Sequence, residues 1–399
     1  MFVAAGDFQG RMTVKRSTER ILTSHAGSLP RPADLLALAK AEPRDKKRYD
    51  ERLTTAVKEI VDRQLEHGVD VIDDGEYGKP DFVGYINERL AGFTPGGSGG
   101  PGFAMRDVKH FPEFYEEFRR QHAPYAPMLA RMYPSLICTG PIKYVGQAVL
   151  QRDIANLKAA LKDRAPSDVF MPAISPENTE QAKRNEYYET GEEYSIAIAE
   201  ALNEEYRAIV DAGFLVQIDD PQLITYYNRN ADKTVAECRK WAEGRIEILN
   251  HALRGIPEEK IRFHTCYSFD ALPRVGDMEL KDMLDMILKI NAGAYSFEGA
   301  NPRHEHEYEL WKTTKLPDGK ILMPGVVAIS TTVVEHPDLV AQRLLRYAEL
   351  VGRENVIACS DCGFGTVAEN AEIHASVAWA KIDALVEGAR RATKVLWRQ

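Results

Sequence analysis

Residues 210–221, VDAGFLVQIDDP, hold the pattern that decides the fold: the end of an amphipathic helix, a glycine, a short apolar strand, and then acids. In the segment before it, Ile198, Leu202 and Ile209 share one helical face. Gly213 is suited to the left-handed conformation that often ends a helix. The strand is nearly all apolar, which is typical of a strand buried on both faces of a parallel sheet. This stretch therefore predicts an α/β unit whose strand ends in carboxylates.

The same pattern recurs along the chain as LEHGVDVIDDGE (65–76), INAGAYSFE (290–298) and, more loosely, LVGRENVIACSD (350–361). Further apolar runs are RILTSHAGS (20–28), SLICTGPI (135–142), VFMPAIS (169–175), KIRFHTC (260–266) and ILMPGVV (321–327). These nine candidates exceed by one the strands of an eight-stranded barrel, and the sequence does not say which lies outside. Alternation of strands and helices over about 370 residues favours an α/β fold of the (β/α)8 TIM-barrel type over a doubly wound sheet. No GxGxxG or Walker-type loop supports nucleotide binding.

Composition limits the classes of function. The 399 residues carry a net charge of −9 and no Lys/Arg-rich run, which argues against a nucleic-acid or anionic-membrane binder. No stretch approaches the roughly 18 apolar residues of a membrane span. Five cysteines form no disulfide framework in a chain of this length, so we expect a reducing, cytoplasmic environment.

The sequence predicts one catalytic domain over residues 20–399, preceded by a flexible tail over residues 1–19. Its most glycine-rich segment, AGFTPGGSGGPGF (91–103), has five Gly between residues 96 and 102. That composition predicts a surface loop without a packed element. A lid over the barrel mouth is the alternative interpretation, since long loops there often serve as lids.

Ionisable side chains end the predicted strands, and in such barrels the C-terminal strand ends form the active face. They are Glu76, Asp219, His264, Cys266, Glu298, Asp361 and Cys362. Such groups are costly at the ends of apolar strands unless they pair or bind something. A salt bridge explains any single acid, but several strands ending this way at one rim indicate a functional site.

The soft ligands among these residues suggest a metal. His264 and Cys266 are two residues apart on an extended strand, so both side chains point the same way and can reach one ion. With Cys362 and Glu298 they make a tetrahedral zinc set whose oxygen ligand could yield to substrate. A buried cysteine beside a hydrogen-bonded histidine is the plainer alternative. A closed structural site using Cys359 and Cys362 as a CxxC pair is another, although strand alternation would turn those two to opposite faces.

Six motifs in order make the chain resemble the catalytic domain of cobalamin-independent methionine synthase from about residue 20 onward. They are TSHAGSLP (23–30), DDGEY (73–77), VQIDDP (216–221), the HxC of His264 and Cys266, Glu298, and Asp361-Cys362-Gly363. The resemblance implies zinc bound by His264, Cys266, Glu298 and Cys362, with Cys359 left in the core. It also implies homocysteine held at Ser28, Glu76 and Asp219, the two acids facing its ammonium. A zinc-bound thiolate would then attack an activated carbon and make a thioether.

The chain departs from that family in the half of the site that binds folate. The two-barrel methionine synthases have an additional N-terminal half that helps to bind folate, and we expect this chain to lack it. The segments TGPIKYVGQ (139–147) and MPAISPENT (171–179) contain no counterpart of the family's folate-stacking Trp. GVVAIST (325–331) places Ala328 and Ser330 where the family has an Asp and a His. We therefore expect methyl transfer to a thiol, with homocysteine as the first candidate and a donor other than folate polyglutamate.

Other residues are candidates for acid–base chemistry or for binding an anionic substrate group. NPRHEHEYELW (301–311) follows Glu298 and supplies His304 and His306 as proton donors, with His25 as a third candidate. Arg31 and Arg303 are candidates for an anionic substrate group. A solvated, mixed-charge loop and structural arginines are the alternatives.

Two other functions remain open on sequence grounds. Epoxyalkane:coenzyme M transferases resemble single-domain members of this superfamily and open an epoxide with a zinc-bound thiolate, but their thiol has no ammonium for Glu76 and Asp219 to bind. A non-catalytic barrel with a structural zinc is the second alternative, although a Glu ligand is unusual in such sites. The expected partners are a small-molecule thiol and an alkyl donor, with no nucleic acid and no membrane. The sequence does not decide between a monomer and a homo-oligomer.

Overall fold

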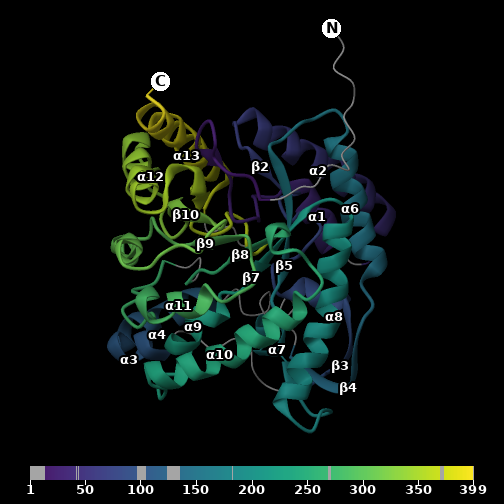
Figure 1. Ribbon diagram of the computed structural model, residues 1–399. Coiled ribbons are helices and arrows are strands. Elements are labelled where there is room, and N and C mark those ends of the chain that lie inside the picture. The colour runs from purple at the N-terminus through teal and green to yellow at the C-terminus, as the bar shows by residue number, and fades with distance from the viewer. Residues whose placement is uncertain are drawn as a thin grey trace.

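Eight parallel strands form one curved sheet in the order β1-β11-β10-β9-β8-β7-β5-β2, which follows the chain around a barrel (Figure 1). The computed structural model describes residues 14–398 except 42, 44, 97–104, 124–134, 182, 268–270 and 369–372. The strands are β1 (Leu22–Thr23), β2 (Val71–Ile72), β5 (Asp168–Ile174), β7 (Leu215–Asp219), β8 (Ile261–His264), β9 (Ala294–Phe297), β10 (Ile321–Val327) and β11 (Ile357–Ser360). This confirms the predicted TIM-barrel type of fold.

The barrel nearly closes at a seam between β1 and β2. The backbone N–H of Asp70 donates to the carbonyl of Thr23 (3.1 Å), and the hydroxyl of Ser24 donates to the carbonyl of Val71 (3.0 Å). The two strands have only two residues each and stand at the two ends of the sheet order, so these hydrogen bonds close the barrel without a continuous strand pairing.

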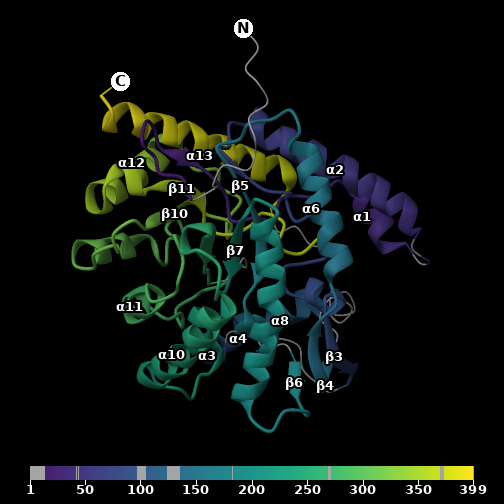
Figure 2. The same ribbon diagram turned by 45° about the vertical axis from the view of Figure 1, so that its right-hand side comes forward.

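Helices cover the outside of the barrel (Figures 1 and 2). The long ones are α2 (Lys46–Glu66), α6 (Gln147–Leu161), α8 (Gly191–Asp211), α10 (Val235–Ala252), α12 (Pro337–Val351) and α13 (Ala375–Leu396). Shorter ones are α1 (Ala33–Lys40), α7 (Pro176–Gln181), α9 (Gln222–Arg229) and α11 (Leu284–Ile287), with 3-10 turns η3 (Glu258–Lys260), η4 (Leu280–Asp282), η5 (Glu305–Lys312) and η6 (Arg353–Asn355). In α8 the predicted face of Ile198, Leu202 and Ile209 is buried, and Gly213 has φ +99° after the helix end.

The ninth predicted strand, 135–142, lies outside the barrel. It is β4 (Leu136–Tyr144), which pairs antiparallel with β3 (Leu90–Pro95) and parallel with β6 (Lys183–Asn185). The excursion between β2 and α6 contains η1 (Gly84–Glu88), β3, α3 (Met105–His110), α4 (Pro112–His122) and β4. Figure 2 shows β3, β4 and β6 together at the end of the molecule away from the two termini.

The glycine-rich segment was expected to contain no packed element, and this is wrong for its first part. Residues 91–95 belong to β3, where Phe93 pairs with Cys138 and the backbone ladder offsets the weak propensity of the sequence. Residues 97–103 lie outside the described residues, so the lid interpretation stays a prediction.

Residues from the predicted flexible tail close the end of the barrel where the strands begin. The N–H of Val14 donates to the carbonyl of Glu259 (2.8 Å), and its side chain packs under both small apolar clusters of the barrel interior. The hydroxyl of Ser17 donates to the carbonyl of Val356 (2.6 Å). The packed domain therefore begins before residue 20, and residues 1–13 are not described. Within the described part of the chain, none of the helices is long and apolar enough to cross a membrane.

Candidate active site

A buried group of one imidazole and two thiols lies at the C-terminal end of the barrel. His264 ends β8, Cys266 follows two residues later, and Cys362 comes two residues after β11. The Sγ atoms of Cys266 and Cys362 are 3.4 Å apart, and the ligand atoms of all three residues lie within 4.8 Å of one another. The Nδ1 of His264 faces the hydroxyl of Ser296 (3.1 Å), while its buried Nε2 has no hydrogen-bond partner among the described residues. Two sulfurs and an unsatisfied nitrogen are the donor set that zinc prefers.

The electrostatics of the group favour a thiolate. The contact with the Cys266 thiol and the neighbouring His264 lower the pKa of Cys362 below the usual thiol value despite burial. The same contact raises the pKa of Cys266 well above the usual thiol value. One sulfur thus carries the negative charge that a divalent cation would bind.

Glu298, the predicted fourth ligand, directs its carboxylate to neighbouring loops. Its Oε1 accepts from the N–H of Tyr267 (2.7 Å) and its Oε2 from the amide of Asn301 (2.8 Å). The Nη1 of Arg274 lies 3.7 Å from Oε1. Among the described residues the group within 4.8 Å includes His264, Cys266 and Cys362 but not Glu298, so its role as a ligand stays a prediction.

Cys359 lies in the barrel interior with Leu22, Ala294, Ile321, Met323 and Ile357, fully buried. The hydroxyl of Ser296 lies 3.9 Å from its sulfur. The strand ends at Ser360, so strand alternation does not decide between Cys359 and Cys362. The alternative that pairs them is not favoured because Cys359 packs in the barrel interior while Cys362 contacts Cys266.

Glu76 stands in the loop after β2 with φ +57°, a left-handed conformation that is uncommon for a residue with a long side chain. The carboxylate of Asp74 accepts from the N–H of Glu76 (2.9 Å), and the guanidinium of Arg31 donates to its carbonyl (2.8 Å). These contacts hold a strained backbone, and strain of this kind clusters at functional sites.

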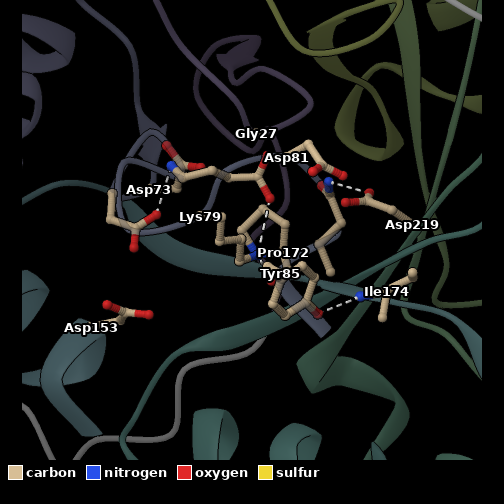
Figure 3. Close-up of polar contacts among 12 residues, drawn as sticks. Gly27, Asp73, Lys79, Asp81, Tyr85, Asp153, Pro172, Ile174 and Asp219 are labelled. Atoms are coloured by element: carbon tan, nitrogen blue, oxygen red, sulfur yellow. Dashed lines mark hydrogen bonds and ion pairs between the residues drawn. The ribbon is translucent and has the colours of Figure 1, made fainter. Parts of the chain in front are cut away.

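The side chains of Glu76 and Asp219 are each fixed by one neighbouring donor. The ammonium of Lys79 donates to Oε1 of Glu76 (3.0 Å) and to the carbonyl of Pro172 (2.6 Å). The amide of Gln217 donates to Oδ1 of Asp219 (2.8 Å). Figure 3 shows the Asp219 carboxylate turned toward the group around Lys79. Burial raises the pKa of Asp219 to about 7, although His264 opposes this.

Ser28 joins this acidic side of the site to the thiol side. A Cβ added to Gly363 would lie 2.1 Å from the hydroxyl oxygen of Ser28, so Ser28 packs directly against the residue after Cys362. A Cβ on Gly27 would lie 3.8 Å from the carboxyl carbon of Glu76. The structure therefore brings Ser28, Glu76 and the thiols of the candidate metal site to one end of the barrel.

Arg31 is engaged by backbone rather than facing an open space. Its guanidinium donates to the carbonyls of Gly365 (2.6 Å), Glu76 (2.8 Å) and Lys79 (3.0 Å). This geometry matches the structural alternative, in which Arg31 ties the loop after β11 to the loop after β2.

His25 is a neutral, enclosed imidazole. Its Nε2 lies 2.7 Å from the amide oxygen of Gln64 on α2, and its Nδ1 accepts from the N–H of Gly27 (3.1 Å). Burial lowers the pKa of His25 to about 4. With both nitrogens engaged, His25 is poorly placed to donate a proton to a substrate.

His304 is buried between two carboxylates. Its Nδ1 lies 3.1 Å from Glu307 and its Nε2 3.2 Å from Asp277, and its ring stacks on Tyr267 at 3.7 Å between centroids. Burial opposes the charge, but the two carboxylates raise the pKa of His304 to about 9. It lies beside the residue that follows Cys266, so it orders the edge of the site.

His306 and Arg303 are exposed, in contrast to His304. Arg303 lines a cavity of about 460 Å³ together with Arg106, Lys109, Asp277 and Glu279. The predicted catalytic or binding roles of both residues stay predictions.

Two residues support the site in ways that the sequence did not predict: Lys79 was not a candidate, and Asp361 was named only as a strand-end acid in a motif. Lys79 holds Glu76, and the Oδ1 of Asp361 accepts from the N–H groups of Gly299 (2.8 Å) and Ala300 (2.9 Å), which fixes the turn after Glu298. Asp361 stands in the Asp-Cys-Gly motif, and Lys79 comes three residues after Glu76 in GEYGKPDF. Those spacings were the available signals, but neither indicates which atom the side chain contacts.

Residues 184–384 match the family described as "Cobalamin-independent synthase, Catalytic domain". The chain belongs to the cobalamin-independent methionine synthase family. It is 25% identical to a methionine synthase of Sulfolobus acidocaldarius over 346 residues, covering 86% of this chain and 85% of that protein. It is 23% identical to a methionine synthase of Thermococcus kodakarensis over 394 residues, covering 94% and 95%.

A solved structure shares the fold of this methionine synthase family member. A B12-independent methionine synthase from Shewanella sp. W3-18-1 superimposes with a TM-score of 0.71 at 21% identity, covering 95% of this chain and all of that one. The family membership and the barrel confirm the fold and the enzyme class that the motifs predicted.

Proposed function

We propose that this enzyme transfers a methyl group to the sulfur of homocysteine, giving methionine, at a zinc ion held by His264, Cys266 and Cys362. The observation that carries the proposal is the buried donor set: two sulfurs 3.4 Å apart beside an imidazole Nε2 without a partner among the described residues. When bound there, zinc would lower the pKa of a substrate thiol and so supply a thiolate at neutral pH.

The chain's own residues define the rest of the acceptor site. Glu76 and Asp219 would bind the ammonium of homocysteine, with Ser28 beside them. Glu298 is the candidate fourth ligand, a place it would take by exchanging its bonds to Tyr267 and Asn301. The relatives from Sulfolobus acidocaldarius and Thermococcus kodakarensis carry the name methionine synthase, and the Shewanella protein was solved with selenomethionine, which supports an amino-acid thioether as product.

The donor is proposed to differ from folate polyglutamate. The segment 325–331 offers Ala328 and Ser330, neither of which transfers protons at neutral pH. The backbone N–H of Ala328 donates to Glu335 (2.7 Å), and Glu335 pairs with Lys381 (2.9 Å). This region is thus filled by a structural contact, which supports a donor that needs no protonation from it.

The test is a thiol-consumption assay on zinc-quantified protein, with His264→Ala as control. Homocysteine and coenzyme M are offered separately, each with methyltetrahydrofolate, methylcobalamin or epoxypropane. We expect methionine from homocysteine, abolished by His264→Ala. A hydroxyalkyl thioether of coenzyme M would instead establish the epoxide-opening reaction. Tightly held zinc without turnover, retained in Glu298→Ala, would favour a structural metal.

A further inference from the structure

Lys79 is a buried lysine whose contacts all lie at the acidic edge of the candidate site. Its ammonium donates to Glu76 Oε1 (3.0 Å) and to the carbonyl of Pro172 (2.6 Å), and it lies 4.4 Å from the centre of the Tyr85 ring. Figure 3 shows Lys79 beside Tyr85 and Pro172. Two fixed acceptors and an aromatic face therefore leave this side chain little freedom.

The surroundings of Lys79 are strongly acidic. Burial alone would lower the pKa of Lys79, but the carboxylates of Glu76 and Asp74 raise it, so the side chain is a cation at neutral pH. Burying a carboxylate without a counter-charge is costly. Lys79 supplies that counter-charge for Glu76.

The two acids share one pattern of hydrogen bonding. Oε1 of Glu76 is held by Lys79 and Oδ1 of Asp219 by Gln217. The second oxygen of each carboxylate accepts no hydrogen bond from the described part of the chain. Neither of these two oxygens is one of the fully buried side-chain atoms that lack a hydrogen-bond partner. Each acid therefore has one oxygen fixed by the protein and one left for a ligand.

We propose that Lys79 is a positioning residue for acceptor recognition: by fixing one oxygen of Glu76 it aims the other, together with Asp219, at the ammonium of an amino-acid thiol. This rests on the proposed function, since it assumes a thiol acceptor at the neighbouring metal site. The opposite role is that Lys79 competes with the substrate ammonium for Glu76. The hydrogen bond to Pro172 argues against competition, because it holds the lysine in place.

The experiment measures thiol binding directly, so it needs no methyl donor. Zinc-loaded protein is titrated by calorimetry with homocysteine and with 4-mercaptobutanoate, which is homocysteine without its amino group. The variants are Lys79→Met, Lys79→Arg and Lys79→Gln, the last keeping a donor for the Pro172 carbonyl in case the methionine variant does not fold. Lys312→Met is the matched control, because Lys312 pairs with Glu309 at the same i,i+3 spacing on an exposed surface. Metal content and melting temperature are recorded for each protein.

We expect the unsubstituted protein to prefer homocysteine by roughly tenfold or more, the scale of one well-placed charge contact. Lys79→Met and Lys79→Gln should reduce this preference to about threefold or less without weakening 4-mercaptobutanoate, while Lys79→Arg keeps most of it and Lys312→Met all of it. If Lys79→Met leaves the preference for homocysteine unchanged or increases it, the inference about Lys79 is overturned but the proposed function is not. Binding of neither thiol by the unsubstituted protein overturns the proposed function.

Discussion

At the scale of single residues, His304 shows how strongly burial and charge alter one side chain. Its pKa of about 9 lies above the value near 6.5 of an unfolded chain, because Asp277 and Glu307 hold its protonated form. The folded state therefore binds the proton more tightly. Protonated His304 therefore adds roughly 3 kcal/mol to the free energy of unfolding below pH 6.5, and this contribution is lost as the pH rises through 9.

We expect His304→Gln to be less stable than the unsubstituted protein by roughly 3 kcal/mol at pH 6 and close to it above pH 9. Urea unfolding at several pH values measures the difference between the two proteins. His306→Gln is the control, because His306 lies two residues away and is exposed. A difference that does not change with pH would show that His304 contributes packing rather than charge.

The cysteines allow a direct test of the metal ligands. Cys266→Ala and Cys362→Ala should each weaken zinc binding by more than about 100-fold, since even partners outside the ligand set cost about 10–100-fold when lost. Cys359→Ala should keep its zinc, because Cys359 packs in the barrel interior. Zinc retained after dialysis against a chelator measures this, with melting curves to confirm folding. Loss of zinc from Cys359→Ala would restore the CxxC alternative.

These residues also show what the sequence could predict about the site. Strand alternation places His264 and Cys266 side by side from their spacing alone, and the Asp-Cys-Gly motif identifies Cys362. The enclosure of His25 comes from Gln64 on another element, so no local pattern reveals it. The same holds for Lys79, whose partner Pro172 is 93 residues away.

At the scale of elements, the contact between α12 and α13 depends on a glycine. A Cβ at Gly388 in α13 would lie 2.3 Å from Cγ1 of Val340 in α12, closer than carbon atoms approach. Gly244 is an equally helical glycine in α10 with nothing within 4 Å of its added Cβ. The two positions therefore differ in packing but share the same backbone propensity.

Alanine at these positions should act in opposite directions. We expect Gly388→Ala to destabilise the protein by about 1–3 kcal/mol through overpacking. Gly244→Ala should stabilise it by roughly 0.5–1 kcal/mol, because alanine loses less backbone entropy in a helix. Denaturant unfolding curves of both variants measure the change in the free energy of unfolding. No change in Gly388→Ala would mean that α12 and α13 separate easily.

Element prediction succeeded where burial produces an all-apolar run and failed where pairing alone builds a strand. The barrel strands read as apolar segments because both faces are covered. β3 could not be anticipated, since Leu90–Pro95 contains Gly92 and Pro95, which are rare in strands, and is stabilised by its pairing with β4. The extra strand β4 could not be excluded from the barrel, because its composition matches that of the others.

At the scale of the whole molecule, one buried arginine joins the excursion after β2 to the barrel. Arg89 pairs with Asp153 on α6 (2.8 Å) and with Glu205 on α8 (3.0 Å). Arg89→Met would leave Glu205 buried without a counter-charge, bonded only to the hydroxyls of Tyr85 and Tyr144, while Asp153 keeps Arg152. We therefore expect a loss of about 3–5 kcal/mol in the free energy of unfolding. Arg120→Met, which breaks an exposed pair with Glu117, should change it by less than about 0.5 kcal/mol. Equal effects would mean that the excursion is held by its strands alone.

The β1–β2 seam is the place where we expect the barrel to open most readily. β1 and β2 have two residues each, whereas β5 and β10 have seven each. Segments with few backbone bonds open at lower free energy, so amide hydrogens at the seam should exchange with deuterated solvent sooner than those of β5 and β10. Ser28 and Glu76 follow the two seam strands, while His264 ends a strand with neighbours on both sides. Local breathing of the seam would thus reach Ser28 and Glu76 before it reaches His264.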